Sequence, residues 1–449
     1  MKRVMSILVL VMVVAVCVSP VGAAEQKDWT WMVFLNADNN LDSFGVGDQD
    51  EMAKVGSNEH LNIVSLIDRE GGPATLNYIE KGKITPLKDM GELDMGDYKQ
   101  LISFVADTVK AYPAKHYALI IWNHGSGWKN ADGAIIKGIS YDDSSNNHIT
   151  TEQLGLAMGE IKNTLGKNLD ILGMDACLMQ MVEVAYAVKN SCDFVVASEE
   201  TEPGEGYPYD DILGGLTKDI KVVDFAKHWV AAYTASYGGG SQGTSASTQS
   251  ALDCSKLDAV KDAIDGFAKA AIAGKFSAQF KDGLNKVQKF YYKTNIDLAH
   301  LVGVLKASIT DEGFQTACKK LEDACGDAII ANGNSGSSMK NAKGLAVYFP
   351  ASSYSFSAEY NALAFAKDSL WDEMVQDYYK KITAPTIVTD VEKGDMSSLM
   401  AYVQTANVNN REISSDLISK LNFRVYSEGG MSSSIQDSVK TLVSELKNK

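Results

Sequence analysis

The sequence has 449 residues, of which 45% are hydrophobic and 22% charged, with only eight prolines. This composition is typical of a folded globular protein and excludes a disordered or collagen-like chain. The formal net charge of −15 excludes a nucleic-acid binder that relies on neutralising phosphates, because the sequence contains no cluster of Lys and Arg that would do so.

The first 24 residues predict a secretory signal peptide. Lys2 and Arg3 form a basic start, residues 4–18 are almost entirely apolar, and small residues precede Glu25. This pattern is typical of a segment cleaved after Ala24. The apolar run is short for a membrane span, which needs about 20 residues. We therefore expect an exported mature protein, secreted or periplasmic, with no stable membrane span.

Short apolar runs of strand length alternate with helical patterns along the chain. Strands are predicted at 30–36, 61–67, 117–122, 169–174, 194–198 and 344–350. Helices are predicted at 97–112, 151–165 and 178–189, and Thr150 with Gln153 predicts a capping box for the second of them. Buried strands separated by helices predict an α/β fold whose mostly parallel sheet is covered on both faces. Beyond residue 383 the pattern changes to short pieces and a polar helix at 434–447.

Five cysteines remain after the signal peptide, and an odd number in an exported chain indicates at least one free thiol. They are Cys177, Cys192, Cys254, Cys318 and Cys325. Cys318 and Cys325 are seven residues apart in a predicted helix at 311–330, a separation of about 10 Å that excludes a disulfide between them.

Two strand ends carry the residues that suggest chemistry. The strand at 117–122 leads into His124 and Gly125, and the strand at 169–174 leads into Asp175 and Cys177. A helix predicted to begin at about Leu178 would place the thiol at its N-terminus, where a lowered pKa is expected. Because one crossover helix separates the two segments, we expect both side chains at the same edge of the sheet.

A thiol and an imidazole are the groups that acyl transfer requires, although each has an ordinary structural alternative. A cysteine beside a core helix is commonly a small buried side chain, and a histidine after a strand is commonly a hydrogen-bonded structural group. A serine hydrolase with Ser126 or Ser198 as nucleophile is a further alternative, but neither lies in a G-x-S-x-G motif.

The segments IIWNHGSGW at 120–128 and ILGMDACLMQMVEVAY at 171–186 resemble the His-Gly and Asp-Ala-Cys signatures of the clostripain family of cysteine peptidases. This family belongs to one clan with caspases, legumains and gingipains. WMVFLNADNNLD, ISYDDSSNNHITTEQL, VVASEETEPGEGYPYDDIL and GLAVYFP also match, so the resemblance spans roughly residues 30–350. It implies a caspase-like α/β/α sandwich with a mostly parallel central sheet at 25–355, followed by a smaller C-terminal extension of uncertain fold at 356–449.

The resemblance also assigns roles to residues. It makes Cys177 the nucleophile and His124 its catalytic partner, with the main-chain N–H groups of Gly125 and Cys177 as oxyanion donors. It places Asp175, two residues before the nucleophile, in the primary substrate pocket, and Glu205 is our second candidate for that pocket. Carboxylates pair well with basic side chains, so we expect protein or peptide substrates cleaved after Lys or Arg.

Relatives are often matured by self-cleavage between the His and Cys segments. No arginine occurs between Glu70 and Asn410, so such a cut must follow a lysine, and Lys137 is the candidate because it lies in the polar loop after His124.

The mechanism requires no cofactor, but some relatives depend on calcium, so a structural Ca²⁺ is a further expectation. Asp38-x-Asn40-x-Asp42 copies the start of an EF-hand loop but lacks its later ligands, and no metal site is assigned. Two alternatives stay open: an inactive homologue that binds peptides or a surface partner, and a related peptidase specific for Asp or Asn. The oligomeric state is also left open.

Overall fold

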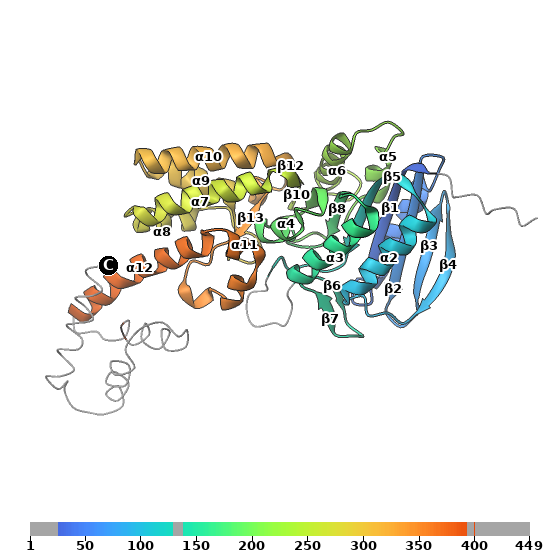
Figure 1. The fold of residues 1–449 in the computed structure, drawn as a ribbon, viewed down its shortest axis with the longest axis horizontal. Coiled ribbons are helices and arrows are strands. Elements are labelled where there is room, and N and C mark those ends of the chain that lie inside the picture. The colour runs from blue at the N-terminus through green and yellow to red at the C-terminus, as the bar shows by residue number, and fades with distance from the viewer. Residues whose placement is uncertain (1–25, 129–137, 393–398, 400–449) are drawn as a thin grey trace, which may run out of the picture.

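The computed structural model describes residues 26–128, 138–392 and 399. The predicted signal peptide, Lys137 and the predicted helix at 434–447 lie outside these residues. Figure 1 shows two parts side by side: a large sheet flanked by helices, and a group of helices formed by residues from 257 onward.

Nine of the described strands form one sheet, in the order β12-β10-β9-β8-β5-β1-β2-β3-β4. The five central strands from β9 to β2 run parallel, and antiparallel strands extend the sheet at both edges. The bounds are β1 Lys27–Ala37, β2 Leu61–Arg69, β3 Ala74–Glu80, β4 Lys83–Gly91, β5 Ala114–Trp122, β8 Leu169–Asp175, β9 Cys192–Ala197, β10 Ser247–Asp253 and β12 Ile329–Ser335.

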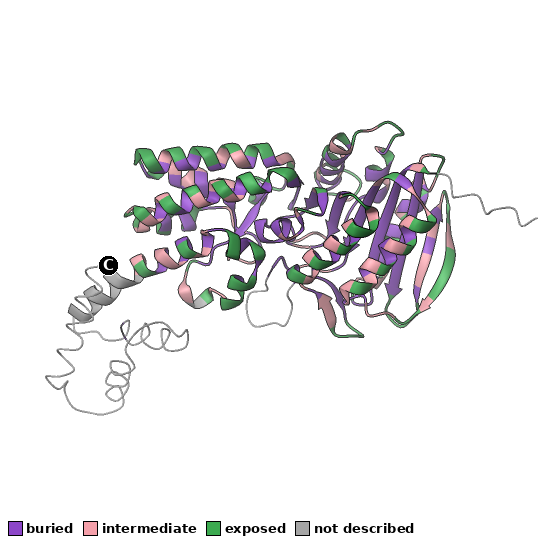
Figure 2. Ribbon diagram, in the orientation of Figure 1, coloured by how far each residue is buried: buried purple, intermediate pink, exposed green. Residues whose placement is uncertain are grey.

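Helices cover both faces of this sheet, which confirms the predicted α/β/α sandwich. Their bounds are α1 Asp42–Val55, α2 Tyr98–Ala111, α3 Thr151–Leu165, α4 Val182–Val188, α5 Tyr209–Gly214 and α6 Val222–Tyr237. Alternate residues of β5 face opposite ways: Leu119 and Ile121 join the cluster that includes α2 and α3, whereas Ile120 and Trp122 join the cluster that includes α1 and α6. Figure 2 shows the central strands buried, whereas the edge strand β4 and the outer faces of the helices are exposed.

The predicted elements before residue 170 are largely confirmed. α2 begins after Asp97, whose side chain accepts a hydrogen bond from Lys99 N–H. The predicted capping box at the start of α3 is present, with Thr150 and Gln153 each accepting from the other's main-chain N–H.

The last predicted strand, at 344–350, is present but lies outside the large sheet. It forms β13, Ala346–Tyr348, which pairs with β11, Asn295–Asp297, in a separate two-stranded sheet. The position beside β9 is occupied instead by β10, which pairs antiparallel with both β9 and β12. A second small sheet joins β6, Ile139–Asp142, to β7, Asn147–Ile149.

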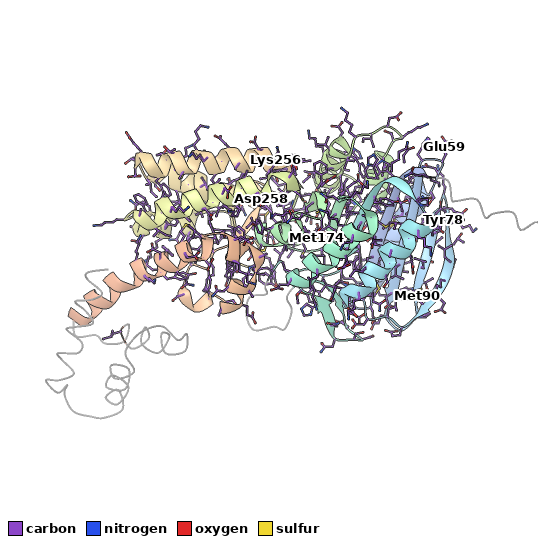
Figure 3. The ribbon with its side chains drawn as sticks, viewed as in Figure 1. Glu59, Tyr78, Met90, Met174, Lys256 and Asp258 are labelled. Carbon is purple, nitrogen blue, oxygen red and sulfur yellow. The ribbon has the colours of Figure 1, made fainter. Side chains whose placement is uncertain are left out.

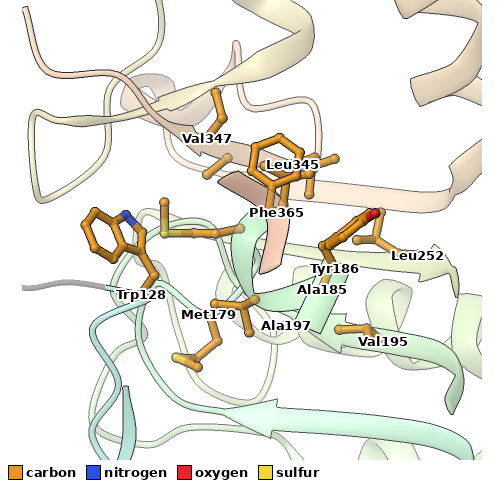
Figure 4. Close-up of a cluster of buried hydrophobic side chains, with 14 of the residues drawn as sticks. Trp128, Met179, Ala185, Tyr186, Val195, Ala197, Leu252, Leu345, Val347 and Phe365 are labelled. Atoms are coloured by element: carbon orange, nitrogen blue, oxygen red, sulfur yellow. The ribbon is translucent and has the colours of Figure 1, made fainter. Parts of the chain in front are cut away.

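The remaining helices pack against the β9–β10 end of the sandwich. They are α7 Leu257–Ala273, α8 Ser277–Lys286, α9 Leu298–Ser308, α10 Glu312–Ala328, α11 Ala364–Asp368 and α12 Trp371–Glu392. Figure 4 shows where the two parts meet: Val195, Ala197 and Leu252 from the large sheet lie near Leu345 and Val347. Further along the chain, Trp371 is fully buried and its indole N–H donates to Tyr348 C=O. The predicted division at residue 355 stays a prediction, and residues on both sides of it belong to one hydrophobic cluster.

One buried carboxyl group at this junction predicts how stability depends on pH. Glu183 on α4 accepts hydrogen bonds from Tyr348 N–H and Tyr360 O–H, while its second oxygen is buried without a partner among the described residues. Burial raises the pKa of Glu183 to about 7. The folded protein therefore holds this proton more tightly than the unfolded chain, and the resulting stabilisation is lost as pH rises through about 7.

We expect the Glu183→Gln variant to melt at a higher temperature than the wild type at pH 8, because it removes the cost of ionising a buried carboxyl group. Near pH 5 the two proteins should melt at similar temperatures. Thermal unfolding followed by circular dichroism across this pH range checks the prediction. Glu59→Gln is the matched control. Glu59, labelled at the outer edge in Figure 3, has a side chain that is 83% exposed, so its replacement should not change how the melting temperature depends on pH. A lower melting temperature for Glu183→Gln at pH 8 would contradict the prediction.

Candidate active site

The register of two central strands brings His124 and Cys177 to one edge of the sheet. β5 and β8 are parallel neighbours, and Trp122 lies opposite Asp175 at their carboxyl ends. Asn123 N–H donates to Asp175 C=O at 3.2 Å, so the pairing continues beyond the strands. His124 and Cys177 each follow this paired position by two residues. The predicted location at a common edge is therefore confirmed.

The imidazole of His124 is held by a residue that the sequence analysis did not assign to catalysis. Its Nε2 lies 2.7 Å from Oδ1 of Asn40, in the loop between β1 and α1. An amide oxygen only accepts, so Nε2 carries the proton and the lone pair of the neutral ring lies on Nδ1. Burial lowers the pKa of His124, and the charge of Asp143 opposes this effect. The ring is therefore neutral near pH 7.

Asn123, although adjacent to His124, has a different role. Its side-chain N–H group donates to the main-chain oxygens of Asn36 and Tyr141, and its Oδ1 accepts from Tyr141 N–H. These bonds tie the end of β1 to β6 beneath the site, so Asn40 and not Asn123 orients the His124 ring.

We expect Asn40→Ala to lower kcat by about 10-fold to 100-fold with little change in KM, because a hydrogen bond to a group that becomes charged contributes about 1.5–3 kcal/mol. Steady-state kinetics on a peptide substrate measures kcat and KM separately. Asn168→Ala is the matched control, because the Asn168 side chain is bonded to Asp193 at the opposite end of β8. An unchanged kcat in Asn40→Ala would contradict the positioning role.

The main chain next to His124 packs directly on the cysteine segment. A Cβ atom on Gly125 would lie 2.6 Å from Cys177 C=O and 3.0 Å from the Ala176 Cβ, so only glycine fits this approach. Within the described part of the chain, neither Gly125 N–H nor Cys177 N–H donates to another residue's main-chain carbonyl. Both donors are therefore available to a ligand, as the predicted oxyanion role requires.

The predicted helix beginning at Leu178 is wrong. α4 begins at Val182, and Leu178 has φ of +66°. The intervening residues are held in another conformation because Leu178 N–H donates to Glu200 C=O and Gln180 N–H donates to Ser198 C=O. Cys177 therefore does not lie at a helix N-terminus, and the pKa lowering expected from a helix dipole does not apply.

The half-buried thiol of Cys177 is enclosed by the loop 198–208. Glu202 N–H donates to Sγ at 3.4 Å, and Sγ lies 3.9 Å from Glu202 C=O. Burial raises the pKa of the Cys177 thiol; the hydrogen bond from Glu202 opposes this effect, whereas the charge of Asp175 adds to it. The thiol is therefore protonated near neutral pH in this structure, and a base is needed to ionise it.

Asp175 is buried, two residues before the thiol. Its Oδ2 accepts hydrogen bonds from Tyr209 O–H at 2.9 Å and from Tyr207 N–H at 3.2 Å. Gly206, with φ of +57°, passes so close that a Cβ there would lie 2.9 Å from Asp175 Oδ1. Burial raises the pKa of Asp175 to about 6. Met174, labelled near the middle of Figure 3, precedes this residue on β8.

A second carboxyl group lies against Asp175, but it belongs to Glu202 and not to Glu205. The two carboxyl groups are in hydrogen-bond contact, both Glu202 oxygens are buried, and the Ala176 main-chain N–H group faces the Glu202 carboxyl group. Glu205 is exposed, and its main-chain oxygen accepts from the Gln242 side chain. No feature of the sequence separates Glu202 from the other acids of this loop.

A cleft of about 460 Å³ opens on the other side of the catalytic ring. Asn40, His124, Tyr141, Asp143, His148 and Tyr292 are among the residues that line it. The site therefore combines buried carboxyl groups close to Cys177 in the fold with an open polar cleft beside His124.

The two serines considered as alternative nucleophiles are buried and already hydrogen-bonded. Ser126 Oγ lies 2.9 Å from Tyr141 Oη, and Ser198 Oγ lies 2.8 Å from Thr248 Oγ1. Cys192, Cys254, Cys318 and Cys325 are buried as free thiols, and Cys177 is a free thiol that is only half-buried. Among the described residues, the Cys177 thiol is thus the most accessible of the candidate nucleophiles considered at this edge of the sheet.

Two of the three oxygen-bearing side chains of the EF-hand-like segment have other partners. Asn40 is bonded to His124, and Asp42 forms two hydrogen bonds with the Arg69 guanidinium. Among the described residues, no group of three or more His, Cys, Asp or Glu side chains is arranged to hold a metal ion. The expected structural calcium stays a prediction. Within the same residues, no helix is both long and apolar enough to span a bilayer.

The fold and the site together define a class of protein: an α/β sandwich that presents a cysteine and a histidine on neighbouring strand ends beside an acidic pocket. Residues 33–378 match the model of the clostripain family, and the chain belongs to this family of cysteine peptidases. Clostripain from Hathewaya histolytica is 32% identical over 218 residues, which is 41% of this chain and 41% of that protein.

Solved structures support the fold. A secreted C11 cysteine protease from Bacteroides thetaiotaomicron, in complex with an irreversible peptide inhibitor, has a TM-score of 0.60 at 20% identity and covers 77% of this chain and 100% of that one. An inactive zymogen C11 protease from Parabacteroides distasonis has a TM-score of 0.57 at 20% identity, with 77% and 98% covered. These likenesses establish a common fold.

Proposed function

We propose that this chain is an exported endopeptidase that cleaves peptide bonds after Lys or Arg through an acyl-enzyme on Cys177. The observation that carries this proposal is the buried Asp175 carboxyl group beside the thiol, with a second carboxyl group against it and no cation among its described neighbours. Burying uncompensated carboxyl groups is unfavourable, and a substrate ammonium or guanidinium group would offset that cost.

In this mechanism the Cys177 thiol loses its proton to Nδ1 of His124, which is the free nitrogen of a ring held by Asn40. The thiolate attacks the scissile carbonyl carbon, and the developing oxyanion accepts hydrogen bonds from the N–H groups of Gly125 and Cys177. His124 then donates the proton to the leaving amine, and a thioester remains on Cys177. Water hydrolyses this acyl-enzyme, with His124 accepting a proton from the water.

The proposed reaction needs no cofactor. Export would follow from the sequence of the first 24 residues, and maturation by self-cleavage at Lys137 is part of the proposal. Mass spectrometry of an active preparation tests the cut: two fragments that separate at Lys137 are expected, whereas a single uncut active chain would contradict it.

A panel of peptides that differ only in the residue before the scissile bond tests the proposed activity. Lys and Arg peptides should be cleaved by the wild type, and Asp, Asn and Gly peptides should be cleaved far more slowly. Preference for Asp or Asn would refute the pocket assignment. An absence of cleavage of every peptide by the folded, mature protein would favour the inactive, peptide-binding alternative.

A further inference from the structure

Glu202 connects the substrate pocket to the nucleophile. Its main-chain N–H and C=O groups flank Sγ of Cys177 at 3.4 Å and 3.9 Å, while its carboxyl group contacts that of Asp175. The two carboxyl groups therefore form a pair, Asp175–Glu202, and the main chain of Glu202 joins this pair to the thiol of Cys177.

The surroundings of this pair contain acids and phenols but no bonded cation among the described residues. The ionisable groups facing the Asp175–Glu202 pair and Cys177 are Asp48 on α1, Glu200 and Tyr207 in the loop 198–208, Tyr209 on α5, Tyr233 and Tyr237 on α6, and His124, which accepts the thiol proton in the proposed mechanism. Tyr209 O–H and Tyr207 N–H donate hydrogen bonds to Asp175, whereas the Ala176 main-chain N–H group faces the buried Glu202 carboxyl group.

Such a pair cannot ionise fully in a buried site, so its two carboxyl groups share one proton and carry one negative charge. Burial and the charge of Asp175 raise the pKa of Glu202 well above its usual range, so the pair keeps a proton. The remaining charge on Asp175 acts on the thiol, because it also raises the pKa of Cys177.

We propose that the basic side chain of the substrate does more than bind: by cancelling the negative charge of the Asp175–Glu202 pair, it favours formation of the Cys177 thiolate. This inference rests on the proposed specificity for Lys and Arg. In the free enzyme, one negative charge beside Sγ opposes a second one on the sulfur. When an ammonium group enters the pocket and the pair keeps its proton, the pocket becomes neutral and this repulsion disappears.

As a consequence, the enzyme would distinguish basic from neutral substrates in the rate at which the thiolate attacks, and not only in binding. A substrate with a neutral side chain leaves the pocket charge in place and meets a protonated thiol, whereas a basic side chain both docks and activates the nucleophile. The thiol proton passes to Nδ1 of His124 or to water, so no further reactant is needed.

The ionisation of Cys177 can be measured without catalysis, from the pH dependence of its alkylation by iodoacetamide. The mature wild-type enzyme is alkylated across a pH series in the presence of n-butylammonium chloride, which mimics the lysine side chain. Two controls replace this salt by sodium chloride of equal ionic strength or by n-butanol. Cys177→Ala provides the background from other thiols. Competitive inhibition of lysyl-peptide hydrolysis shows separately whether n-butylammonium occupies the pocket.

We expect n-butylammonium to lower the midpoint of the alkylation profile by about one pH unit, the order of effect of one unit charge at a few ångströms. Sodium chloride and n-butanol should leave the midpoint unchanged. In the double variant Asp175→Asn/Glu202→Gln, the midpoint should be low without any cation and should not respond to n-butylammonium. Glu205→Gln, which alters an exposed acid of the same loop, should behave as the wild type.

The outcomes separate this inference from the proposed function. If n-butylammonium competes with substrate but the midpoint does not fall, the charge coupling is wrong and the Lys/Arg pocket stands. If n-butylammonium does not compete with the lysyl peptide at all, the pocket assignment is wrong, and the proposed coupling between the pocket charge and Cys177 is wrong as well.

Discussion

Replacing Cys177 by alanine is expected to lower kcat/KM on lysyl and arginyl peptides by about 10⁴-fold or more, as removal of a covalent nucleophile does in other hydrolases. The alanine variant keeps the Gly125 contact and the acidic pocket but cannot form a thioester. Binding should therefore survive, so a lysyl peptide should still bind in an equilibrium assay while its hydrolysis is lost. Initial rates and fluorescence-detected binding measure the two quantities.

Cys318→Ala is the matched control for this variant. Cys318 is a fully buried free thiol on α10, where truncation lowers stability without removing a reacting group. Its activity per folded molecule should equal that of the wild type. Retained hydrolysis in Cys177→Ala would exclude Cys177 as the nucleophile.

Replacing Asp175 by asparagine is expected to lower kcat/KM for Lys and Arg peptides by about 10²-fold to 10³-fold, because close charge pairs at interfaces contribute roughly 1.5–7 kcal/mol. Asparagine retains an oxygen that can accept from Tyr209 O–H and Tyr207 N–H, so the change removes charge and not shape. Rates on otherwise identical Lys and Gly peptides measure the effect, and the ratio between them should fall sharply.

The control for Asp175→Asn is Glu205→Gln. The Glu205 side chain is exposed, and the structure connects this residue to Gln242 through its main-chain oxygen. We therefore expect a much smaller loss in Glu205→Gln than in Asp175→Asn. Equal losses of kcat/KM in the two variants would place Glu205 in the pocket beside Asp175. An unchanged ratio of the rates on Lys and Gly peptides in Asp175→Asn would show that another group binds the basic side chain.

The central sheet could be predicted because its parallel strands are buried on both faces and therefore consist of nearly continuous apolar runs. The strands β10 and β12 escaped this criterion because both are rich in polar residues. Ser250 Oγ donates to Gly344 C=O, and Ser247 Oγ lies 3.0 Å from Ser335 Oγ. These hydrogen bonds make polar residues compatible with burial, and they depend on tertiary partners that periodicity does not reveal.

The candidate site was only partly predictable for the same reason. His124 and Cys177 stand at strand ends, which a sequence pattern can locate. Asn40 contacts His124 from a loop 84 residues earlier, and Glu202 reaches Asp175 from a loop that contains several similar acids. The helix predicted at Leu178 failed because hydrogen bonds to Ser198 and Glu200 override the local helical pattern.

The acyl-enzyme itself tests the proposed mechanism most directly. The mature enzyme is mixed with a lysyl ester, quenched in acid within the first turnover and mapped by mass spectrometry. The mechanism predicts one lysyl acyl group on the peptide that contains Cys177, released by neutral hydroxylamine as a thioester should be, and none when Cys177 is alanine. A lysyl adduct on a serine, or rapid turnover with no covalent adduct on Cys177, would contradict it.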